Sequence, residues 1–545
     1  MSMKTNLKIS ILLLLMISAD IFATDYGYFI TFTDKAGTPY SIDKPEQFLS
    51  ARAIQRRRKQ DIPVTATDLP VNPDYVNNLR KLGITVKYTS RWMNGCIAFS
   101  SDAALMDTLD KYSYVKSVDL TYKSSSSGSA KLEKEKAGLK SGGTDNPYGS
   151  AFNQINTVNG ISLHDRGYQG QDMIIAIIDA GFYGADQLPA FDHLWENGQI
   201  LGTKDFVNPN SNIFLEHNHG MNVLSIIGGE IEGEFMGTAP EASFWLLRSE
   251  DVNSEFPIEA DYWICAAEFA DSAGVDVINT SLGYNEFDDP DMNYSYSDLD
   301  GNTVRISKAA DIAAATGMIV VISAGNEGNK TWKYITAPAD AKGVITIGAM
   351  TADSVKATFS SFGPTADGRI KPDVTAMGVS NAIQLTNGSI GTGSGTSFSA
   401  PVMTGLMACL WQSVSDMTAR DVKDLMLESC NNYSSPDNSM GYGIPNFKTA
   451  YNTSSKSHTK MNNDKWDVYP NPFVNQLILT TKENIAVDRI EVSLYDITGR
   501  LQYKEMITAS PKIYLDIPSY LTGGLYILHI KENDIVSQYK LMKNP

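Results

Sequence analysis

The sequence predicts a doubly wound α/β domain with a mostly parallel sheet in the middle of the chain, flanked by a small α+β unit and a small β-sandwich. Uninterrupted apolar runs at residues 173–178 and 319–322 are typical of strands buried on both faces of a parallel sheet. The apolar run at residues 402–411 has the length of a buried helix. Toward both ends, shorter strands and polar segments replace these runs, which indicates separate domains.

Length and composition restrict the possible functions. The 545 residues are enough for about three or four domains. A formal net charge of −17 argues against nucleic acid as a partner and favours solubility outside the cell. Four cysteines are too few for a disulfide framework. Cys409, within the apolar helix, is expected as a free buried thiol, and a bridge from Cys430 to Cys265 or Cys409 stays open.

The first 23 residues have the pattern of a secretory signal peptide. Lys4 and Lys8 precede an apolar stretch at residues 9–18, and Ala23 supplies a small residue for cleavage. The stretch is shorter than the roughly 20 residues that span a bilayer. We therefore expect export of the chain, with residues 1–23 removed and no transmembrane segment.

Residues 24–123 predict the α+β unit. Strands are expected at residues 28–32, 86–88, 96–99 and 115–122, and helices at 45–59, 73–82 and 103–112. The basic run at residues 56–59 is most simply a solvated helix face. Residues 124–147, rich in Ser, Gly and Lys, predict a flexible and cleavable linker.

Residues 148–452 form the predicted α/β domain, and polar residues follow its apolar runs. Asp179 ends the strand at residues 173–178, and carboxylates at the carboxyl ends of such strands lie where open α/β sheets place their ligands. Asn326 follows the strand at residues 319–322 and can offer an amide donor to an oxyanion. Asp179 as a helix cap and Asn326 as a turn residue are the structural alternatives.

His219 and Ser397 stand where helices are predicted to begin. His219 and a glycine lead into a helical apolar segment, and a structural histidine is the alternative there. Ser397 lies in the heptapeptide at residues 395–401, which leads into the helix at 402–411, with Pro401 expected in its first turn. Free amides at a helix start favour negative charge beside a serine. A serine hydroxyl needs a neighbouring base and that base an orienting carboxylate, which His219 and Asp179 can supply.

The order Asp179, His219, Asn326, Ser397 resembles that of the subtilisin-like serine proteases, or subtilases, over roughly residues 148–450. The resemblance implies that Ser397 attacks the scissile carbonyl and His219 shuttles the proton. It also implies that Asp179 orients the imidazole and that Asn326 stabilises the oxyanion. Two segments are similar to those that line the substrate cleft in that family, and their residues are Ser281, Leu282, Gly283, Ala324 and Gly325. Gly283 is expected to leave a strand edge open for an extended peptide.

Two positions depart from the family pattern. Ala180 stands where a hydroxyl residue usually follows the aspartate, and Met221 stands where a threonine usually follows the His-Gly pair. Neither residue transfers a proton, so the departures bear on geometry and turnover. The related sedolisin proteases share a Gly-Thr-Ser motif but have an acid in place of the histidine. The presence of His219 therefore argues against a sedolisin. A non-catalytic surface binding or adhesion protein with the subtilase fold is the alternative function.

The resemblance also assigns a role to the N-terminal unit. Subtilases use such a unit as a propeptide that assists folding and blocks the cleft, so residues 24–123 are expected to mask Ser397 until they are removed. A permanently attached accessory domain is the alternative. The implied protein is a secreted serine endopeptidase made as a zymogen, whose partners are protein or peptide substrates and its own propeptide.

An acidic loop at residues 285–302 raises the question of a metal. It carries five aspartates, Asp288, Asp289, Asp291, Asp298 and Asp300. Subtilases often bind calcium, and hard cations prefer oxygen ligands, but the spacing matches no known calcium loop. A solvated acidic insertion, or one that favours basic substrate residues, stays open. No cofactor is required by the implied mechanism, and no metal ligands are assigned.

The last part of the chain differs from the α/β domain in its sequence pattern. Residues 453–465 are polar and predict a linker. Residues 466–545 show short alternating strands with regular turns, which predict a small β-sandwich. This segment resembles the C-terminal sorting domain of the type IX secretion system. A carbohydrate-binding or adhesive module is the rival interpretation. The resemblance implies contact with that machinery, export through the periplasm of a Gram-negative bacterium, and a secreted or cell-surface protein.

Overall fold

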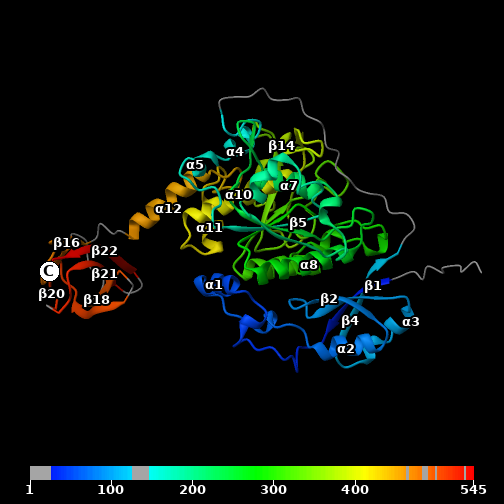
Figure 1. Cartoon of the computed structure of the whole chain (residues 1–545), viewed down its shortest axis with the longest axis horizontal. Coiled ribbons are helices and arrows are strands. Elements are labelled where there is room, and N and C mark those ends of the chain that lie inside the picture. Colours follow the sequence, from blue (N-terminus) through cyan, green and yellow to red (C-terminus); the bar gives the residue numbers. More distant parts are fainter. Residues whose placement is uncertain are drawn as a thin grey trace, which may run out of the picture.

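A computed structural model describes residues 26–124, 146–461, 466–481, 489–497, 500–518, 520–532 and 535–544. The predicted signal peptide, and the predicted linker except for residues 124, 146 and 147, lie outside these residues. Figure 1 shows a large central domain, a smaller N-terminal domain packed against it, and a β-domain beyond the end of helix α12 (Phe447–Met461).

The central domain is built on a sheet of seven parallel strands. Each run expected as a buried strand lies in it, because its alternating side chains all find apolar neighbours. Across the sheet the order is β13 (Val374–Met377), β12 (Ile345–Met350), β11 (Ile319–Ser323), β10 (Val277–Thr280), β5 (Ile174–Asp179), β9 (Ser243–Arg248) and β6 (Ile200–Asp205). The predicted parallel sheet is confirmed.

Helices cover both faces of this sheet. Ile175 and Ile177 of β5 join a core with α7 (His219–Gly228) and α10 (Thr396–Ser413). Ala176 and Ile178, one residue out of phase, join a second core with α8 (Pro257–Ala273) and α9 (Arg305–Ala315). The doubly wound prediction is therefore confirmed. None of the helices in the described part of the chain is long and apolar enough to cross a membrane.

Shorter elements complete the central domain around the sheet and its helices. They are α4 (Phe152–Asn156), α5 (Ile161–His164), α6 (Asp192–Glu196), α11 (Ala419–Glu428), β7 (Glu230–Ile231), β8 (Phe235–Met236), β14 (Asn381–Gln384) and β15 (Ile390–Gly393). The four cysteines of the chain, Cys96, Cys265, Cys409 and Cys430, are buried and free. Neither of the disulfides left open by the sequence is formed.

The N-terminal domain is a four-stranded antiparallel sheet that packs on helix α8 (Figure 1). Its strand order is β2 (Thr85–Ser90), β3 (Gly95–Ser100), β1 (Tyr26–Phe32) and β4 (Val115–Lys123), and its helices are α1 (Ala51–Lys59), α2 (Pro73–Lys81) and α3 (Ala103–Met106). The helical stretches predicted over 45–59 and 103–112 are each divided into a short 3₁₀ turn and a shorter α-helix. Ser50 caps α1, accepting a hydrogen bond from the Ala53 amide, and so sets its start.

The basic run at residues 56–59 is not a solvated helix face throughout, and that prediction was wrong. Arg56 and Arg57 are only 6% and 2% exposed because α1 lies against the central domain. The Arg57 guanidinium binds Asp68 at 2.8 Å and Asp271 of α8 at 2.7 Å. Arg56 binds the same Asp271 and the carbonyl of Val275.

Asp271 is the centre of the contact between the two domains. Its carboxylate also accepts from Arg91 at 2.6 Å, so its side-chain partners among the described residues are three arginines of the N-terminal domain. Burial acts to raise the pKa of Asp271, but the three arginines outweigh it and hold the pKa below its usual value. The negative charge of Asp271 is thus compensated by arginines of the N-terminal domain.

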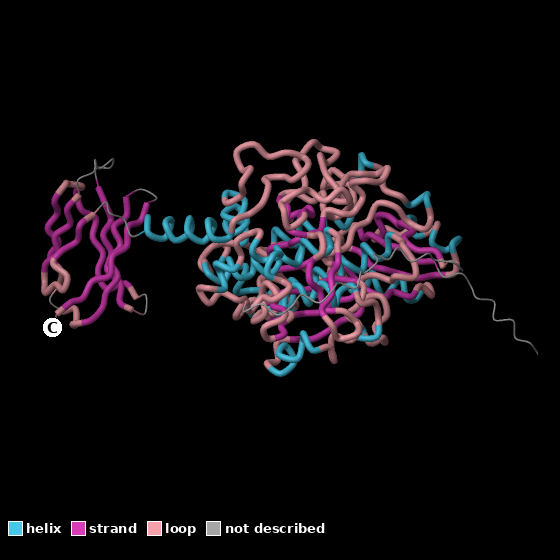
Figure 2. Tube along the Cα trace, turned by 90° about the horizontal axis from the view of Figure 1, so that it is seen from above, coloured by secondary structure: helices cyan, strands magenta, loops and turns pink. Residues whose placement is uncertain are grey.

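The C-terminal domain is a β-sandwich, as predicted. One sheet has the order β16 (Asp467–Tyr469), β17 (Gln476–Thr480) and β20 (Lys512–Asp516). The other has the order β19 (Leu501–Thr508), β18 (Arg489–Asp496), β21 (Gly524–Glu532) and β22 (Ile535–Lys543). Their inner faces share one apolar core. Figure 2 shows that α12 (Phe447–Met461) leads toward this domain, so the predicted linker at 453–465 is helical as far as Met461.

Candidate active site

The polar residues singled out in the sequence gather at one edge of the parallel sheet. Asp179 is the last residue of β5, and Ser281 directly follows β10. Asn326 follows β11, while His219 and Ser397 lie at the starts of α7 and α10. Because carboxyl ends of parallel strands meet at one edge, residues more than 200 positions apart come together.

Asp179 and His219 are in direct contact. The His219 Nδ1 lies 2.7 Å from Asp179 Oδ1, and the aspartate is fully buried. Helix α7 can approach because its second residue is Gly220, where a Cβ would lie 2.4 Å from the Gly181 carbonyl oxygen. The contact fixes the imidazole with its Nδ1 toward the carboxylate, which leaves Nε2 as the ring nitrogen for proton transfer.

The second carboxylate oxygen of Asp179 is less well supported. The Ala180 amide donates to Oδ1 at 2.8 Å, but Oδ2 has no hydrogen-bond partner in the described part of the chain. Residue 180 is an alanine, so it offers no side-chain hydroxyl near this carboxylate. Met221, the other departure, is fully buried in the apolar core of α7.

Ser397 lies in the first turn of α10, which begins at Thr396. Pro401 is therefore in the second turn, and its prediction for the first turn was wrong because the helix starts before the apolar run. A proline inside a helix cannot donate to the carbonyl four residues earlier, here that of Ser397. The Ser281 hydroxyl donates to this carbonyl at 2.9 Å instead. Ser281 thus supports the backbone of the candidate nucleophile.

Removal of the Ser281 hydroxyl is expected to weaken both stability and turnover. In Ser281→Ala the Ser397 carbonyl loses its donor, which costs about 1–3 kcal/mol for a buried unsatisfied group. Urea unfolding and kcat/KM on a peptide substrate measure the two effects. Ser281→Thr keeps a hydroxyl and serves as the control, and equal stability of the alanine variant and the parent would contradict the supporting role.

Asn326 is oriented by the residue before the candidate nucleophile. Its Oδ1 accepts from the Thr396 amide at 2.9 Å and from the Thr396 hydroxyl at 3.0 Å. The Thr396 hydroxyl also lies 3.2 Å from the Gly325 amide, which donates to it. With Oδ1 held in this way, the Nδ2 group faces away from Thr396. Such an arrangement suits a donor for an oxyanion beside Ser397.

A cavity of about 280 Å³ joins these groups. Five of its lining residues were expected from the sequence at the substrate or oxyanion positions, and they are Ser281, Leu282, Gly283, Gly325 and Asn326. His219 and Ser397 line it too, whereas Ala324 is fully buried and does not. A Cβ atom added to Gly283 would lie 2.2 Å from the Thr336 hydroxyl oxygen, and a Cβ atom added to Gly325 would lie 2.9 Å from it. Both glycines are thus explained by the close approach of Thr336.

The cavity wall is strongly acidic. Its lining includes Glu250, Asp251, Glu255, Glu286 and Glu327, against the single lysine Lys330. Lys330 pairs with Glu327 at 2.8 Å. Burial, with Glu255 next in effect, raises the pKa of Glu250 well above its usual range. Such a wall favours positively charged groups.

The aspartates of the loop at 285–302 do not gather into a metal site. Asp289 pairs with Lys123 at 2.5 Å, and Asp288 accepts from the Glu255 amide at 3.1 Å. Asp298 and Asp300 accept hydrogen bonds from their own turns. Within the described residues, the group that could hold a metal ion is Glu250, Glu255 and Glu259.

The N-terminal domain does not fill the cavity in the described part of the chain. No residue from 26–124 lines it. Strand β4 ends at Lys123, which contacts the loop that carries the cavity residue Glu286. The masking of Ser397 by residues 24–123 therefore stays a prediction.

Several residues of the site were not found from the sequence. Thr396 was within the recognised heptapeptide, but its contact with Asn326 joins two separate motifs and only the folded chain shows it. Thr336 and the glutamates at 250 and 255 carry no such signal, because their spacing matches no known pattern.

Three regions of the chain match models of known families. Residues 170–443 match the model described as the subtilase family. Residues 27–138 match a peptidase S8 propeptide domain of Bacteroidota. Residues 467–544 match a secretion system C-terminal sorting domain.

Curated relatives are similar over about half of this chain. Serine protease AprX of Bacillus subtilis (strain 168) is 28% identical over 311 residues, which cover 51% of this chain and 65% of AprX. Subtilisin E of the same strain is 28% identical over 56% of this chain and 71% of its own length. Subtilisin of Bacillus pumilus is 27% identical over 56% of this chain and 98% of its own length. Among solved structures, MycP1 with the N-terminal propeptide removed aligns with a TM-score of 0.44 and 21% identity, over 56% of this chain and 97% of MycP1.

Proposed function

The chain belongs to the subtilase family, and from this membership we propose that it is a secreted serine endopeptidase made as a zymogen. The observation that carries the proposal is the 2.7 Å contact between Asp179 and His219 on a cavity that Ser397 also lines. In this proposal Asp179 is the orienting acid, His219 is the base and Ser397 is the nucleophile of acyl transfer.

In the proposed reaction Ser397 Oγ attacks the scissile carbonyl carbon while His219 Nε2 takes the hydroxyl proton. Asp179 holds the Nδ1–H and stabilises the imidazolium that forms. The carbonyl oxygen becomes an oxyanion and accepts from the Asn326 Nδ2 group. His219 then gives its proton to the leaving amine as the C–N bond breaks, which leaves an ester on Ser397. Water, deprotonated by His219, hydrolyses that ester and restores the serine.

The substrate is proposed to bind as an extended strand. Residues 281–283 follow β10 and line the cavity on one side, and Gly325 follows β11 and lines it on another. Backbone groups at such positions can pair with a peptide, while its side chains enter the space between. The proposal assigns Ser281, Leu282, Gly283, Ala324 and Gly325 to this binding, Ala324 through its buried backbone.

Export is the second part of the proposal. The match to a secretion system sorting domain supports transport of the protein to the cell surface or the medium by that machinery. The match to a propeptide domain supports the N-terminal domain as an inhibitor and folding aid that is cleaved off. No cofactor is assigned to the hydrolysis itself.

Covalent labelling tests the proposal directly. A serine-directed fluorophosphonate should label the matured protein at Ser397, and heat denaturation beforehand should remove the labelling. Peptide mapping identifies the labelled residue. A folded, matured protein that takes no label and cleaves no casein would instead be the non-catalytic surface protein.

Asn326→Ala should lower kcat strongly with little change in KM. The expected loss is about 10²- to 10³-fold, or about 2.7–4 kcal/mol, which is the size known for the oxyanion asparagine of subtilisin itself. Steady-state kinetics on a chromogenic peptide measure it. Asn326→Asp keeps the oxygen that Thr396 binds but replaces the donor, and so serves as the matched variant. Unchanged kcat in Asn326→Ala would move the oxyanion role elsewhere.

A further inference from the structure

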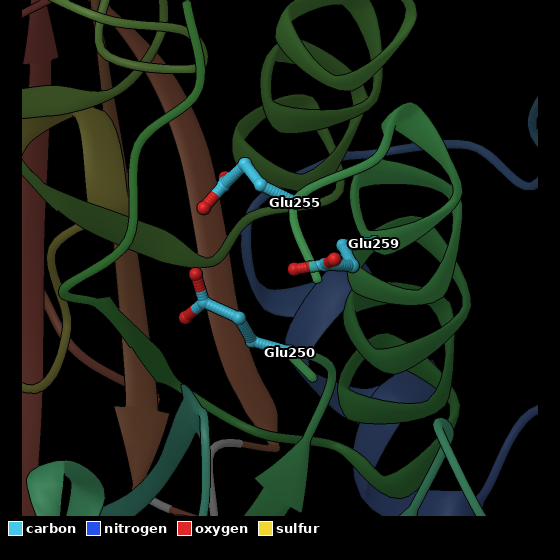
Figure 3. Close-up of side chains that lie close together, drawn as sticks. All are labelled: Glu250, Glu255 and Glu259. Atoms are coloured by element: carbon cyan, nitrogen blue, oxygen red, sulfur yellow. The ribbon is translucent and has the colours of Figure 1, made fainter. Parts of the chain in front are cut away.

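Three glutamates meet in the wall of the catalytic cavity. Glu250 and Glu255 lie in the loop after β9, and Glu259 lies in the first turn of α8. Figure 3 shows their carboxylates directed toward a common space. One oxygen from each lies within 4.8 Å of the other two.

The deepest member of the group has an oxygen with no partner. Glu259 is 1% exposed, and its Oε1 accepts from the Phe256 amide at 3.2 Å to cap α8. Its Oε2 is buried without a hydrogen-bond partner in the described part of the chain. The hydroxyl of Tyr284, also 1% exposed, has no partner there either. Burial, followed by the charges of the three glutamates, raises the pKa of this hydroxyl. Buried polar atoms of this kind are rare unless a water or an ion meets them.

The arginine that acts on Glu250 is shared with other carboxylates. Arg248 acts on Glu250, but its guanidinium binds Asp205 at 2.9 Å and Glu216 at 3.4 Å. A cation among the three carboxylates would remove the repulsion that this arrangement creates.

We infer that Glu250, Glu255 and Glu259 form a binding site for a hard divalent cation in the wall of the catalytic cavity. Calcium is bound by oxygen ligands at about 2.3–2.6 Å, so oxygens at most 4.8 Å apart can share one ion. Three carboxylates supply up to six oxygens, which is the ligand type and number that such an ion takes.

The depth of Glu259 decides between a metal ion and a substrate side chain. Glu250 and Glu255 line the cavity, but Glu259 does not. A lysine or arginine of a substrate entering from the cavity would therefore meet only the outer two glutamates. A metal ion can bridge all three and would tie the loop after β9 to the start of α8. This site is independent of the proposed hydrolysis.

The test measures calcium binding to the full-length Ser397→Ala protein, which removes self-digestion as a complication. Isothermal titration with Ca²⁺ should show a site whose affinity falls at least about tenfold in Glu250→Gln and in Glu259→Gln. Glutamine keeps the oxygen that caps α8, and circular dichroism checks the fold of each variant. Glu286→Gln removes an exposed carboxylate from the same cavity and should bind Ca²⁺ as the parent does.

Three outcomes would overturn the inference. The first is no binding by the parent of Ca²⁺, Mg²⁺ or Mn²⁺ at millimolar concentration. The second is equal affinity and stoichiometry in the parent and in both glutamine variants. The third is that no metal binds while Glu250→Gln, in the active chain, selectively loses cleavage of peptides that contain Lys or Arg. In that case the group is a subsite for a basic substrate side chain.

Discussion

Ser397→Ala is expected to abolish peptide hydrolysis, with a fall in kcat of about 10⁶-fold, the size known for the same change in subtilisin. The reason is that Ser397 supplies the hydroxyl that forms the ester in the proposed reaction: His219 and Ser397 line one cavity, and Asp179 holds the imidazole through its Nδ1. The variant should still fold, because Ser397 supports its surroundings through its carbonyl, which the change leaves in place.

Cleavage of casein and of a chromogenic peptide measures the loss. If maturation is autocatalytic, the variant should also persist as an uncut precursor on a denaturing gel. Ser394→Ala is the control, since Ser394 is exposed three residues before the nucleophile and lines no part of the cavity. Normal casein cleavage by purified Ser397→Ala protein would end the proposed mechanism.

The sequence was sufficient to predict the fold and to bring together the candidate site. The run that ends in Asp179 is apolar at every position, which only a strand buried on both faces allows. Once the strands are parallel, their carboxyl ends share an edge, so Asp179 and Asn326 had to lie near each other. His219 and Ser397 were found because each begins a helix. Their catalytic roles stay predictions until they are measured.

Contacts between distant segments could not be predicted in this way. Arg56 and Arg57 were predicted to be solvated because a run of basic residues does not indicate a contact with Asp271, which lies more than 200 positions later. The Ser281 hydroxyl replaces a donor that Pro401 lacks, and only the folded backbone shows that the two are related. The cluster at Glu250, Glu255 and Glu259 spans a loop and a helix start, so no periodic pattern marks it.

Asp271→Ala is expected to detach the N-terminal domain while leaving the matured enzyme intact. The change leaves the guanidinium groups of Arg56, Arg57 and Arg91 buried without their shared carboxylate. Breaking a buried pair by removing one partner costs about 3–5 kcal/mol, which corresponds to roughly two to four orders of magnitude in the equilibrium between docked and undocked domain. In the Ser397→Ala background, pulse proteolysis of the precursor measures how often that domain is open.

Arg52→Ala is the control, because it removes a more exposed ion pair on the same helix and leaves the buried arginine cluster in place. Its guanidinium is 40% exposed and pairs with Asp276 at 2.5 Å, an arrangement worth at most about 1 kcal/mol. This variant should therefore open far less often than Asp271→Ala. The kcat of matured Asp271→Ala enzyme should equal that of the parent, because the side-chain partners of Asp271 in the described residues all belong to the N-terminal domain. Equal opening in the two variants would show that apolar packing on α8, and not the arginine cluster, holds the domain in place.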